Sequence, residues 1–278
     1  MPHKVILSVT GINHGENDLK IAAELARQIN AHLTFLVVGL AAPPPIGEYA
    51  AMVSDAWLEE RKADMARLEE RVAAVRDFRT ANAPSADLGN RYSEVAFADD
   101  VIGSIARYAD LVVAGPELLA GETLKSKVIE GVLFSSGRPL LLLPSASDVT
   151  LNPRRVAVAW NSTLEASRAV HEAMAFLEGA QQVHVVMIDP VAEKHGAGTE
   201  PGGNIAAFLM RHGIRAVVDR LPSMGQKVED VLRRHVIDIS AELLVMGAYG
   251  HSRVRERIFG GVTRSIVEKT PLPVLMAR

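Results

Sequence analysis

The sequence predicts an α/β protein made of two copies of an open parallel sheet, each covered by helices on both faces. Apolar strands alternate with segments of helical periodicity along the chain. The strands are nearly continuous runs of valine, isoleucine and leucine, which is typical of parallel sheets buried on both faces. Because the order of strands and helices in the first half returns in the second, we expect a duplicated fold.

The first copy opens with a β-branched run at 4–9, and apolar residues at helical spacing predict a helix over 19–29. Further apolar runs predict strands at 33–38, 109–115 and 139–143. The proline-rich segment 43–57 fits either a stiff connector or a flap over a cleft. The charged segment 57–75 predicts a single amphipathic helix on the sheet rather than a coiled-coil seam. Its expected inward residues are Leu58, Met65, Leu68, Val72 and Val75.

The second copy repeats this order. After a strand at 155–159 and the pair Trp160-Asn161, a helix begins with the capping-box pattern Ser162-Thr163-Leu164-Glu165. The remaining strands are predicted at 183–188, 241–247 and 273–276. Serine, aspartate, asparagine and proline cluster at 145–153, which predicts a boundary there. The predicted domains are 1–148 and 153–278.

The composition limits the classes of function. The 278 residues, 48% of them hydrophobic, suffice for two domains with buried cores. A formal net charge of -3 and a pI near 6.3 give no global attraction to nucleic acid or membranes. The absence of cysteine excludes disulfides and thiolate metal sites. With no signal-peptide pattern and no apolar span of about 18 residues, we expect a cytoplasmic protein without nucleic-acid or membrane partners.

Four glycines mark the most informative stretch of the chain. Gly247 follows directly on a buried strand, so it lies at a carboxyl strand end, where open α/β sheets bind their ligands. Gly250 keeps the following turn free of side chains. Gly260 and Gly261 precede apolar residues at helical spacing, which places them at the N-terminus of a last helix. Unpaired backbone N–H groups and the helix dipole favour a phosphate there, and glycine lets it approach closely.

Further donors surround these glycines: Ser252, Arg253, Arg255, Arg257 and Thr263. They suit a phosphorylated ligand. No lysine follows the second glycine pair, so the stretch is not a Walker loop. Backbone N–H groups would make most of the contacts to the phosphate. The arginines alternate with other residue types, so part of the run also fits a solvated face with internal ion pairs. His251 fits either a phosphate contact or an exposed position.

The histidines of the chain show no ligand spacing such as H-x-x-x-H. His184 and His235, among others, are therefore interpreted as neutral core or surface residues. The sequence predicts no metal site.

The glycine pattern carries a resemblance. Gly247-x-x-Gly250, nine residues, Gly260, then Val262-Thr263 and an apolar strand after Pro273 resembles the nucleotide-binding signature of the universal stress protein family. The strand-loop-helix openings of both halves are also similar to that family. The resemblance covers the whole chain as two tandem copies.

This resemblance implies two Rossmann-like, five-stranded parallel sandwiches related by a pseudo-twofold axis, similar to adenine nucleotide alpha hydrolases. It also implies that the last strands, 139–143 and 273–276, pair with each other. The implied ligand is ATP, or ADP or AMP, with Mg²⁺ as an optional companion, at the switch point between the first and fourth strands. Pairing of chains into a homodimer and a further protein partner are left open.

The residues implied to bind the nucleotide belong to the second copy. Those near the adenine are Ala159, Trp160, Asn161 and the backbone around Met187; Trp160 fits packing at the domain interface equally well. Those near the ribose and phosphates are Gly247, Gly250, His251, Ser252, Arg253, Gly260, Gly261, Val262 and Thr263. No catalytic residue is implied.

Two positions depart from the family pattern. Nucleotide-binding members are similar in having serine or threonine after the third glycine, where this chain has Gly261, so one hydroxyl donor is lost. They usually have an aspartate after the first strand, where this chain has Trp160-Asn161-Ser162. The Asn161 carbonyl is expected to accept from the adenine amino group instead.

The first copy differs in kind. It keeps Gly115 and Gly131 but has Pro116 and Glu117 in the turn, with Glu122 and Glu130 nearby. Carboxylates beside a phosphate disfavour its binding. We therefore expect the first copy to bind no nucleotide and to act as a structural partner.

Two functions fit these observations. The first is a regulatory stress-response module whose C-terminal half holds an adenine nucleotide. The second is a nucleotide-free structural module, favoured by Gly261 and the missing aspartate. A slow ATPase is a subordinate reading, because a backbone phosphate grip without an obvious general base or metal carboxylate supplies binding rather than chemistry.

Overall fold

The computed structural model describes residues 3–42, 55–144, 150–190, 200–248, 261–269 and 271–278. The chain divides into two compact units, residues 3–138 and 139–278, here called the N-unit and the C-unit. The predicted connector at 43–57 lies largely outside the described residues. None of the described helices is long and apolar enough to cross a bilayer.

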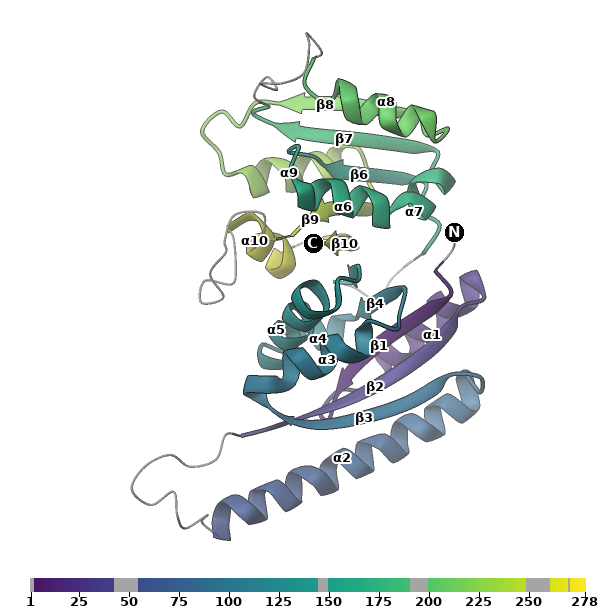
Figure 1. The fold of residues 1–278 in the computed structure, drawn as a ribbon, viewed down its shortest axis with the longest axis vertical. Helices are drawn as coiled ribbons and strands as arrows, with labels where there is room; N and C mark the ends of the chain where they lie inside the picture. The colour runs from purple at the N-terminus through teal and green to yellow at the C-terminus, as the bar shows by residue number, and fades with distance from the viewer. Residues whose placement is uncertain (1–2, 43–54, 145–149, 191–199, 249–260, 270) are drawn as a thin grey trace. The chain divides into compact units, whose positions relative to one another are not determined.

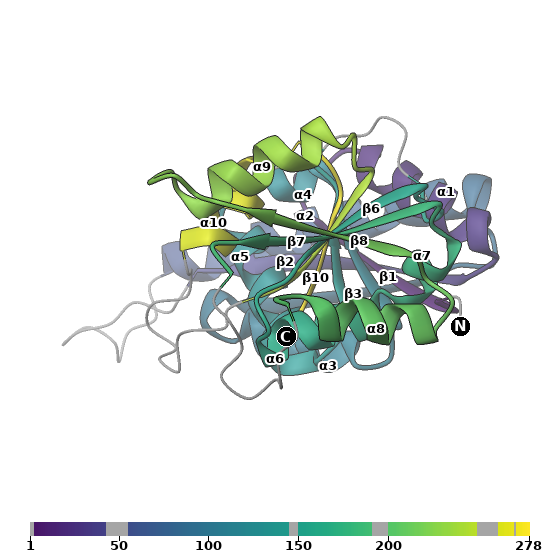
Figure 2. The ribbon, with the colours of Figure 1, turned by 90° about the horizontal axis from the view of Figure 1, so that it is seen from above.

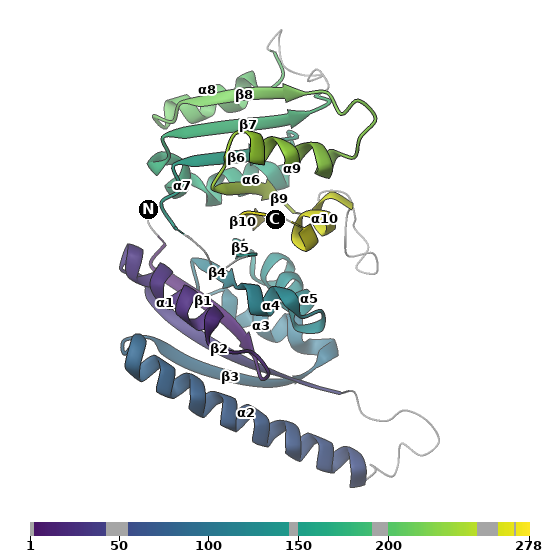
Figure 3. The same cartoon turned by 180° about the vertical axis from the view of Figure 1, so that it is seen from behind.

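The N-unit contains a parallel sheet in the order β3-β2-β1-β4. Its strands are β1 (Val5–Gly11), β2 (His32–Ala41), β3 (Asp87–Glu94) and β4 (Leu111–Ala114). Its helices are α1 (Asn17–Ile29), α2 (Asp55–Asn82), α3 (Ala98–Ala106), α4 (Pro116–Ala120) and α5 (Thr123–Glu130), with a 3-10 turn at Val95–Phe97 and a π-helical turn at Gly131–Ser136. In Figure 1, α3 and α5 lie over one face of the sheet, and Figure 3 shows α1 on the other.

The C-unit contains a sheet in the order β5-β10-β9-β6-β7-β8. Its strands are β5 (Leu140–Leu142), β6 (Arg155–Ala159), β7 (Gln182–Ile188), β8 (Ala216–Leu221), β9 (Leu243–Gly247) and β10 (Val274–Ala277). Its helices are α6 (Leu164–Glu172), α7 (Met174–Gly179), α8 (Gly203–Arg211), α9 (Val228–Asp238) and α10 (Gly261–Lys269). Figure 2 shows α6 and α8 on one face of this sheet and α9 and α10 on the other.

The predicted α/β class and the parallel strands are confirmed. Five strands of the C-unit, β6 to β10, run parallel, and β5 pairs antiparallel with β10 through Leu141 and Leu275. This pairing confirms the expected contact between the last strands of the two copies. The central strands β1, β4, β5, β9 and β10 are almost entirely buried because helices cover both faces, whereas the edge strands β3 and β8 are partly exposed.

The repeat extends to the strand registers. Ile6 pairs with Leu33 on one side and Leu111 on the other, and Val156 pairs in the same way with Val183 and Leu243. These registers align the two units residue by residue. Residues of one unit can therefore be compared with their counterparts in the other.

The amphipathic helix predicted for 57–75 is α2, but its inward face is shorter than expected. Leu68 and Val72 are buried, and Val75 is fully enclosed. Leu58 and Met65 are 42% and 50% exposed, so the prediction that they face inward is wrong. Helical spacing fixes the stripe on which these residues lie, but not how far the sheet beneath the helix extends.

Candidate functional site

The sheet of the C-unit has its topological switch point at β6. Ala159, at the end of β6, pairs with Met246 of β9 on one side and with Val186 of β7 on the other. The chain proceeds from β6 to β7 and β8, and then crosses to β9 on the opposite side. Open α/β sheets bind ligands in the crevice outside the carboxyl ends of the strands at this point. The candidate site lies at this edge.

Gly247 ends β9 where the backbone of α6 comes closest. A Cβ at this position would lie 2.5 Å from the backbone nitrogen of Ala166 and 2.5 Å from the carbonyl carbon of Glu165. Such an approach is possible only for glycine. The next residue, Ala248, is buried and its N–H donates to the carbonyl of Ala277 at 2.9 Å. The sequence prediction that Gly247 lies at a carboxyl strand end is therefore confirmed.

The loop between β6 and α6 is held by its own polar side chains. Thr163 caps α6, since its Oγ1 accepts the N–H of Ala166 at 3.3 Å. Oδ1 of Asn161 accepts the hydroxyl of Thr163 at 2.8 Å and its N–H at 3.4 Å. Ser162, expected as the cap, instead adopts a left-handed conformation with a φ of 59°. The Asn161 carbonyl expected to meet the adenine is thus engaged within its own loop.

The other residues expected near the adenine occupy the same edge. The N–H of Trp160 donates to the carbonyl of Val186 at 2.9 Å, and its side chain is half-buried. Met187 is buried, and its sulfur packs against Gly202: a Cβ placed at Gly202 would lie 2.9 Å from this sulfur. The Met187 side chain therefore packs within the unit. Its backbone can still face the crevice at the end of β7.

Asp189 was missed by the sequence reasoning. It follows β7 at the same edge, with a φ of 46°, and its Oδ1 accepts the N–H of Ser223 at 2.9 Å. Hydrogen bonds from Ser223 hold the pKa of Asp189 below its usual range. Its position one residue beyond an apolar strand is the signal that could have identified it.

The last helix, α10, begins at Gly261, as predicted. Gly261 is exposed, and no heavy atom of the described residues lies within 4 Å of a Cβ placed there. Thr263 is buried together with Ile266 and Val267, while Val262 is half-buried. Because α10 connects the carboxyl end of β9 to the amino end of the parallel strand β10, its N-terminus lies at the edge of the sheet that carries the switch point.

Five of the expected binding residues lie outside the described part of the chain. They are Gly250, His251, Ser252, Arg253 and Gly260. Their contacts stay predictions. The described residues are Ala159, Trp160, Asn161, Met187 and Gly247 at or near the carboxyl ends of β6, β7 and β9, and Gly261, Val262 and Thr263 in the first turn of α10.

The corresponding edge of the N-unit is filled by protein groups. Gly115 is the single residue between β4 and α4, which begins at Pro116. The buried carboxylate of Asp18 accepts the N–H of Glu117 at 2.9 Å and that of Leu118 at 2.9 Å. Any side chain at Gly115 would collide with this carboxylate. An anionic group of the protein itself therefore occupies the N–H groups that could hold a phosphate.

Charged groups surround Asp18. An Nη2–H of Arg71 donates to the carbonyl of Gly15 at 2.5 Å and to Oγ1 of Thr10 at 3.4 Å. Burial raises the pKa of Asp18 against the opposing effect of its backbone hydrogen bonds. Burial disfavours the charged forms of Arg71 and His14 as well, and therefore lowers the pKa of each. These shifts mark a partly desolvated cluster of ionisable groups.

The structure also brings together three side chains that linear spacing did not connect. His184, Asp219 and His235 come from β7, β8 and α9, and their ligating atoms lie within 4.8 Å of one another. The strand register brings these side chains together, and the spacing of the residues along the sequence does not reveal it.

Comparisons with known proteins agree with this architecture. Residues 153–278 match the model of the universal stress protein family. The chain is 24% identical over 196 residues to the universal stress protein Slr1230 of Synechocystis, covering 66% of this chain and 63% of that protein, which is less than two thirds of its length.

Solved structures show a similar fold. A universal stress protein from Archaeoglobus fulgidus aligns with a TM-score of 0.67 at 17% identity, over 99% of this chain and 96% of that one. A functionally unknown protein from Pseudomonas aeruginosa aligns with a TM-score of 0.52 at 14% identity, over 99% and 92%.

Proposed function

Because residues 153–278 belong to the universal stress protein family, we propose that the C-unit binds an adenine nucleotide at the carboxyl edge of β6 and β9. The single observation that supports this most strongly is the closeness of Gly247 to the start of α6. This glycine strand end lies at the edge of the sheet where α10 begins, because α10 connects the carboxyl end of β9 to the parallel strand β10. Backbone N–H groups at such a place favour phosphates.

The adenine would lie at the ends of β6 and β7, beside Ala159, Trp160 and the backbone of Met187. Asn161 can contribute through its amide nitrogen, since its carbonyl oxygen already accepts from Thr163. The phosphates would extend toward Gly261 and Thr263 at the start of α10. The glycine and arginine residues between Gly250 and Gly260 would complete the phosphate contacts.

The proposed role is regulatory rather than enzymatic. Backbone N–H groups supply binding, whereas phosphoryl transfer also requires a positioned nucleophile and charge stabilisation at the transferred group. Nucleotide occupancy would change assembly into a homodimer or the exposure of a surface to a protein partner. Mg²⁺ would accompany the phosphates as part of the ligand.

The N-unit is proposed to bind no nucleotide. Asp18 occupies the N–H groups at the start of α4, and a phosphate would have to displace a carboxylate that is itself buried. Two anions at one helix start repel each other. The N-unit would then act as a structural partner of the C-unit.

The proposal is tested by the nucleotide that the purified protein retains. The protein is denatured, and the supernatant is separated by anion-exchange chromatography beside a Gly250→Asp variant. We expect adenine nucleotide from the wild type and none from the variant, because a carboxylate in the turn repels phosphates. Incubation with ATP and Mg²⁺, sampled over time, measures hydrolysis in the same assay.

One observation favours the alternative of a nucleotide-free structural module. The Asn161 carbonyl is engaged by Thr163, and Gly261 offers no hydroxyl. If the wild type releases no nucleotide and also gives no heat on titration with ATP, this alternative replaces the proposal. Steady release of ADP would instead favour a slow ATPase.

A further inference from the structure

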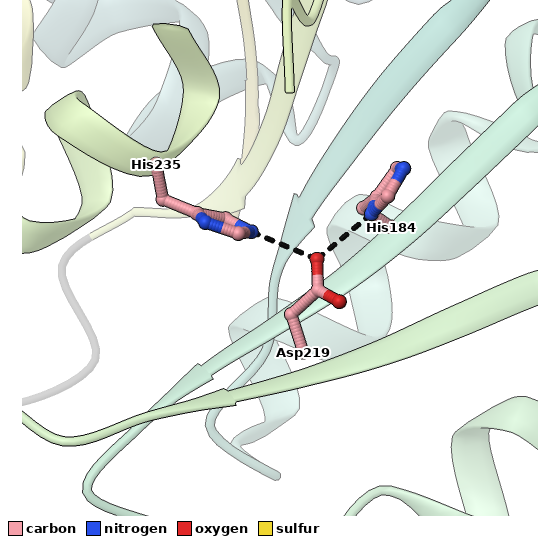
Figure 4. Close-up of side chains that lie close together, drawn as sticks. All are labelled: His184, Asp219 and His235. Carbon is pink, nitrogen blue, oxygen red and sulfur yellow. Dashed lines mark hydrogen bonds and ion pairs between the residues drawn. The ribbon is translucent and has the colours of Figure 1, made fainter. Parts of the chain in front are cut away.

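Beneath α9 in the C-unit, two imidazoles point at a single carboxylate oxygen. Nδ1 of His184 and Nε2 of His235 each lie 2.8 Å from Oδ2 of Asp219. Figure 4 shows the two rings approaching Asp219 from opposite sides, one from a strand and one from the helix. The three side chains are 13%, 17% and 18% exposed for His184, His235 and Asp219.

The fold explains why these residues meet. His184 pairs with Val217, and Val186 pairs with Asp219, so Asp219 lies diagonally across from His184 on the same face of the sheet. That face is covered by α9, whose buried residues include Val236. His235 precedes Val236 and reaches the sheet at the edge of the helix contact. Three separate elements thus deliver the three side chains.

We propose that His184, Asp219 and His235 form a binding site for a divalent transition-metal ion of the zinc type. Imidazole nitrogens and a carboxylate oxygen are ligands that zinc prefers, and three protein ligands leave a coordination position for solvent. The facing atoms already lie within 4.8 Å of one another. The site is separate from the nucleotide edge and does not depend on the proposed function.

Accepting the ion requires the three side chains to rearrange. In a tetrahedral site with bonds of about 2.0–2.1 Å, neighbouring ligand atoms lie about 3.3 Å apart. The nitrogen-oxygen distances of 2.8 Å would therefore open by about half an ångström. The two imidazole nitrogens, which lie within 4.8 Å of each other, would have to close toward the same spacing. In each neutral imidazole the hydrogen on the facing nitrogen moves to the other ring nitrogen, which frees a lone pair for the metal.

A purely structural role would need only one of the two histidines. One imidazole is enough to donate to Oδ2 of Asp219, as the pair of His32 and Asp87 in the N-unit illustrates at 2.9 Å. A second imidazole on the same oxygen completes a chelating set.

The repeat provides an internal comparison. The strand registers align Thr34 with His184 and Gly89 with Asp219. On the helices, Ile105 directly precedes the buried Ala106, just as His235 directly precedes the buried Val236. None of these N-unit residues offers a nitrogen or carboxylate ligand. A cavity of about 460 Å³ lined in part by Thr34 and Ile105 lies at this place in the N-unit. The three ligands are therefore particular to the C-unit.

The test is a zinc titration of the full-length protein. The protein is dialysed against a chelator and then titrated with zinc chloride by calorimetry, without added nucleotide. We expect a site that binds one zinc ion per chain, and a loss of affinity of at least about 100-fold in His184→Gln, Asp219→Asn and His235→Gln. The matched control His32→Gln removes an imidazole from the single-histidine pair and is expected to leave zinc binding unchanged.

Two results would overturn the proposal. One is the absence of stoichiometric binding by the wild type; the other is binding that all three variants retain. X-ray absorption of the zinc-loaded wild type decides the matter even if the variants fail to fold. It is expected to show two imidazole nitrogens with oxygen ligands, and any other number of imidazoles contradicts the assignment.

Discussion

Oδ2 of Asp18 accepts the N–H of Leu118 at 2.9 Å, although the two residues lie in separate elements of the N-unit. With the matching bond from Glu117 to Oδ1, the carboxylate caps the start of α4. An anion of the protein thus takes the place that a phosphate would need. This contact distinguishes the N-unit from the C-unit more directly than the acidic residues of the turn.

Replacing Asp18 should destabilise the protein. Asp18→Ala leaves two N–H groups at the start of α4 without their acceptor, and each buried unsatisfied donor costs about 1–3 kcal/mol. We expect the free energy of unfolding to fall by about 2 kcal/mol or more, measured by urea denaturation. Glu24→Ala, at an exposed ion pair on α1, is the control and should change it by less than about 1 kcal/mol. Equal effects of both substitutions would contradict the capping role.

The pH dependence of stability should contain a contribution from His14. Its Nδ1 accepts the N–H of Gly11 at 2.9 Å, and burial lowers its pKa, with Glu117 opposing the shift and Arg71 adding to it. Because the folded pKa lies below the unfolded pKa of about 6.5, this stability is present above about pH 6.5 and is lost as the pH falls through the folded pKa.

His14→Gln should therefore reduce the loss of unfolding free energy on acidification below about pH 6.5. Urea denaturation of both proteins at a series of pH values measures the two slopes. His212→Gln, at an exposed position after α8, should keep the wild-type slope. If His14→Gln also keeps it, the neutral buried imidazole is not a source of the pH dependence.

Gly247→Ala should strain the start of α6. The new Cβ would lie 2.5 Å from backbone atoms of Ala166 and Glu165, which cannot move as a side chain can. Overpacking of this kind costs about 1–3 kcal/mol, and we expect this loss of unfolding free energy together with weaker nucleotide binding. Gly179→Ala is the control, because its Cβ meets no described atom within 4 Å. A Gly247→Ala protein as stable as the control would show that the close approach is not required.

Gly261→Ser should strengthen nucleotide binding. The Cβ of residue 261 meets no described atom within 4 Å, and the added hydroxyl can donate to a phosphate at the start of α10. A hydrogen bond to a charged group contributes about 1.5 kcal/mol, which is roughly tenfold in affinity. Calorimetric titration with ATP measures this gain. Gly261→Ala adds the same Cβ without the hydroxyl and should gain nothing; an equal gain would contradict a hydroxyl contact.

Much of the fold could be predicted because buried parallel strands carry a strong signal. The runs around Val156 and Leu244 are apolar, and the run around Val185 is interrupted only by His184, since helices cover both faces. The start of α10 at Gly261 followed from the glycine and the spacing of the residues after it. Exposed Leu58 and Met65 could not be predicted, because the length of the sheet beneath α2 is a tertiary property.

The side-chain relationships were harder to predict. Asp18 meets Leu118 only because α1 and α4 lie beside β1, and neither residue belongs to a motif that links them. His184, Asp219 and His235 meet through a diagonal strand register and one helix edge. Asn161 was expected to face a ligand, but the adjacent Thr163 competes for its carbonyl.

The stoichiometry of ATP binding to the nucleotide-free wild type, measured by calorimetry, decides whether the C-unit alone binds nucleotide. We predict one ATP per chain, because no described heavy atom lies within 4 Å of a Cβ placed at Gly261, whereas Asp18 occupies the N–H groups that directly follow β4 in the N-unit. Two ATP molecules per chain, or none, would contradict it.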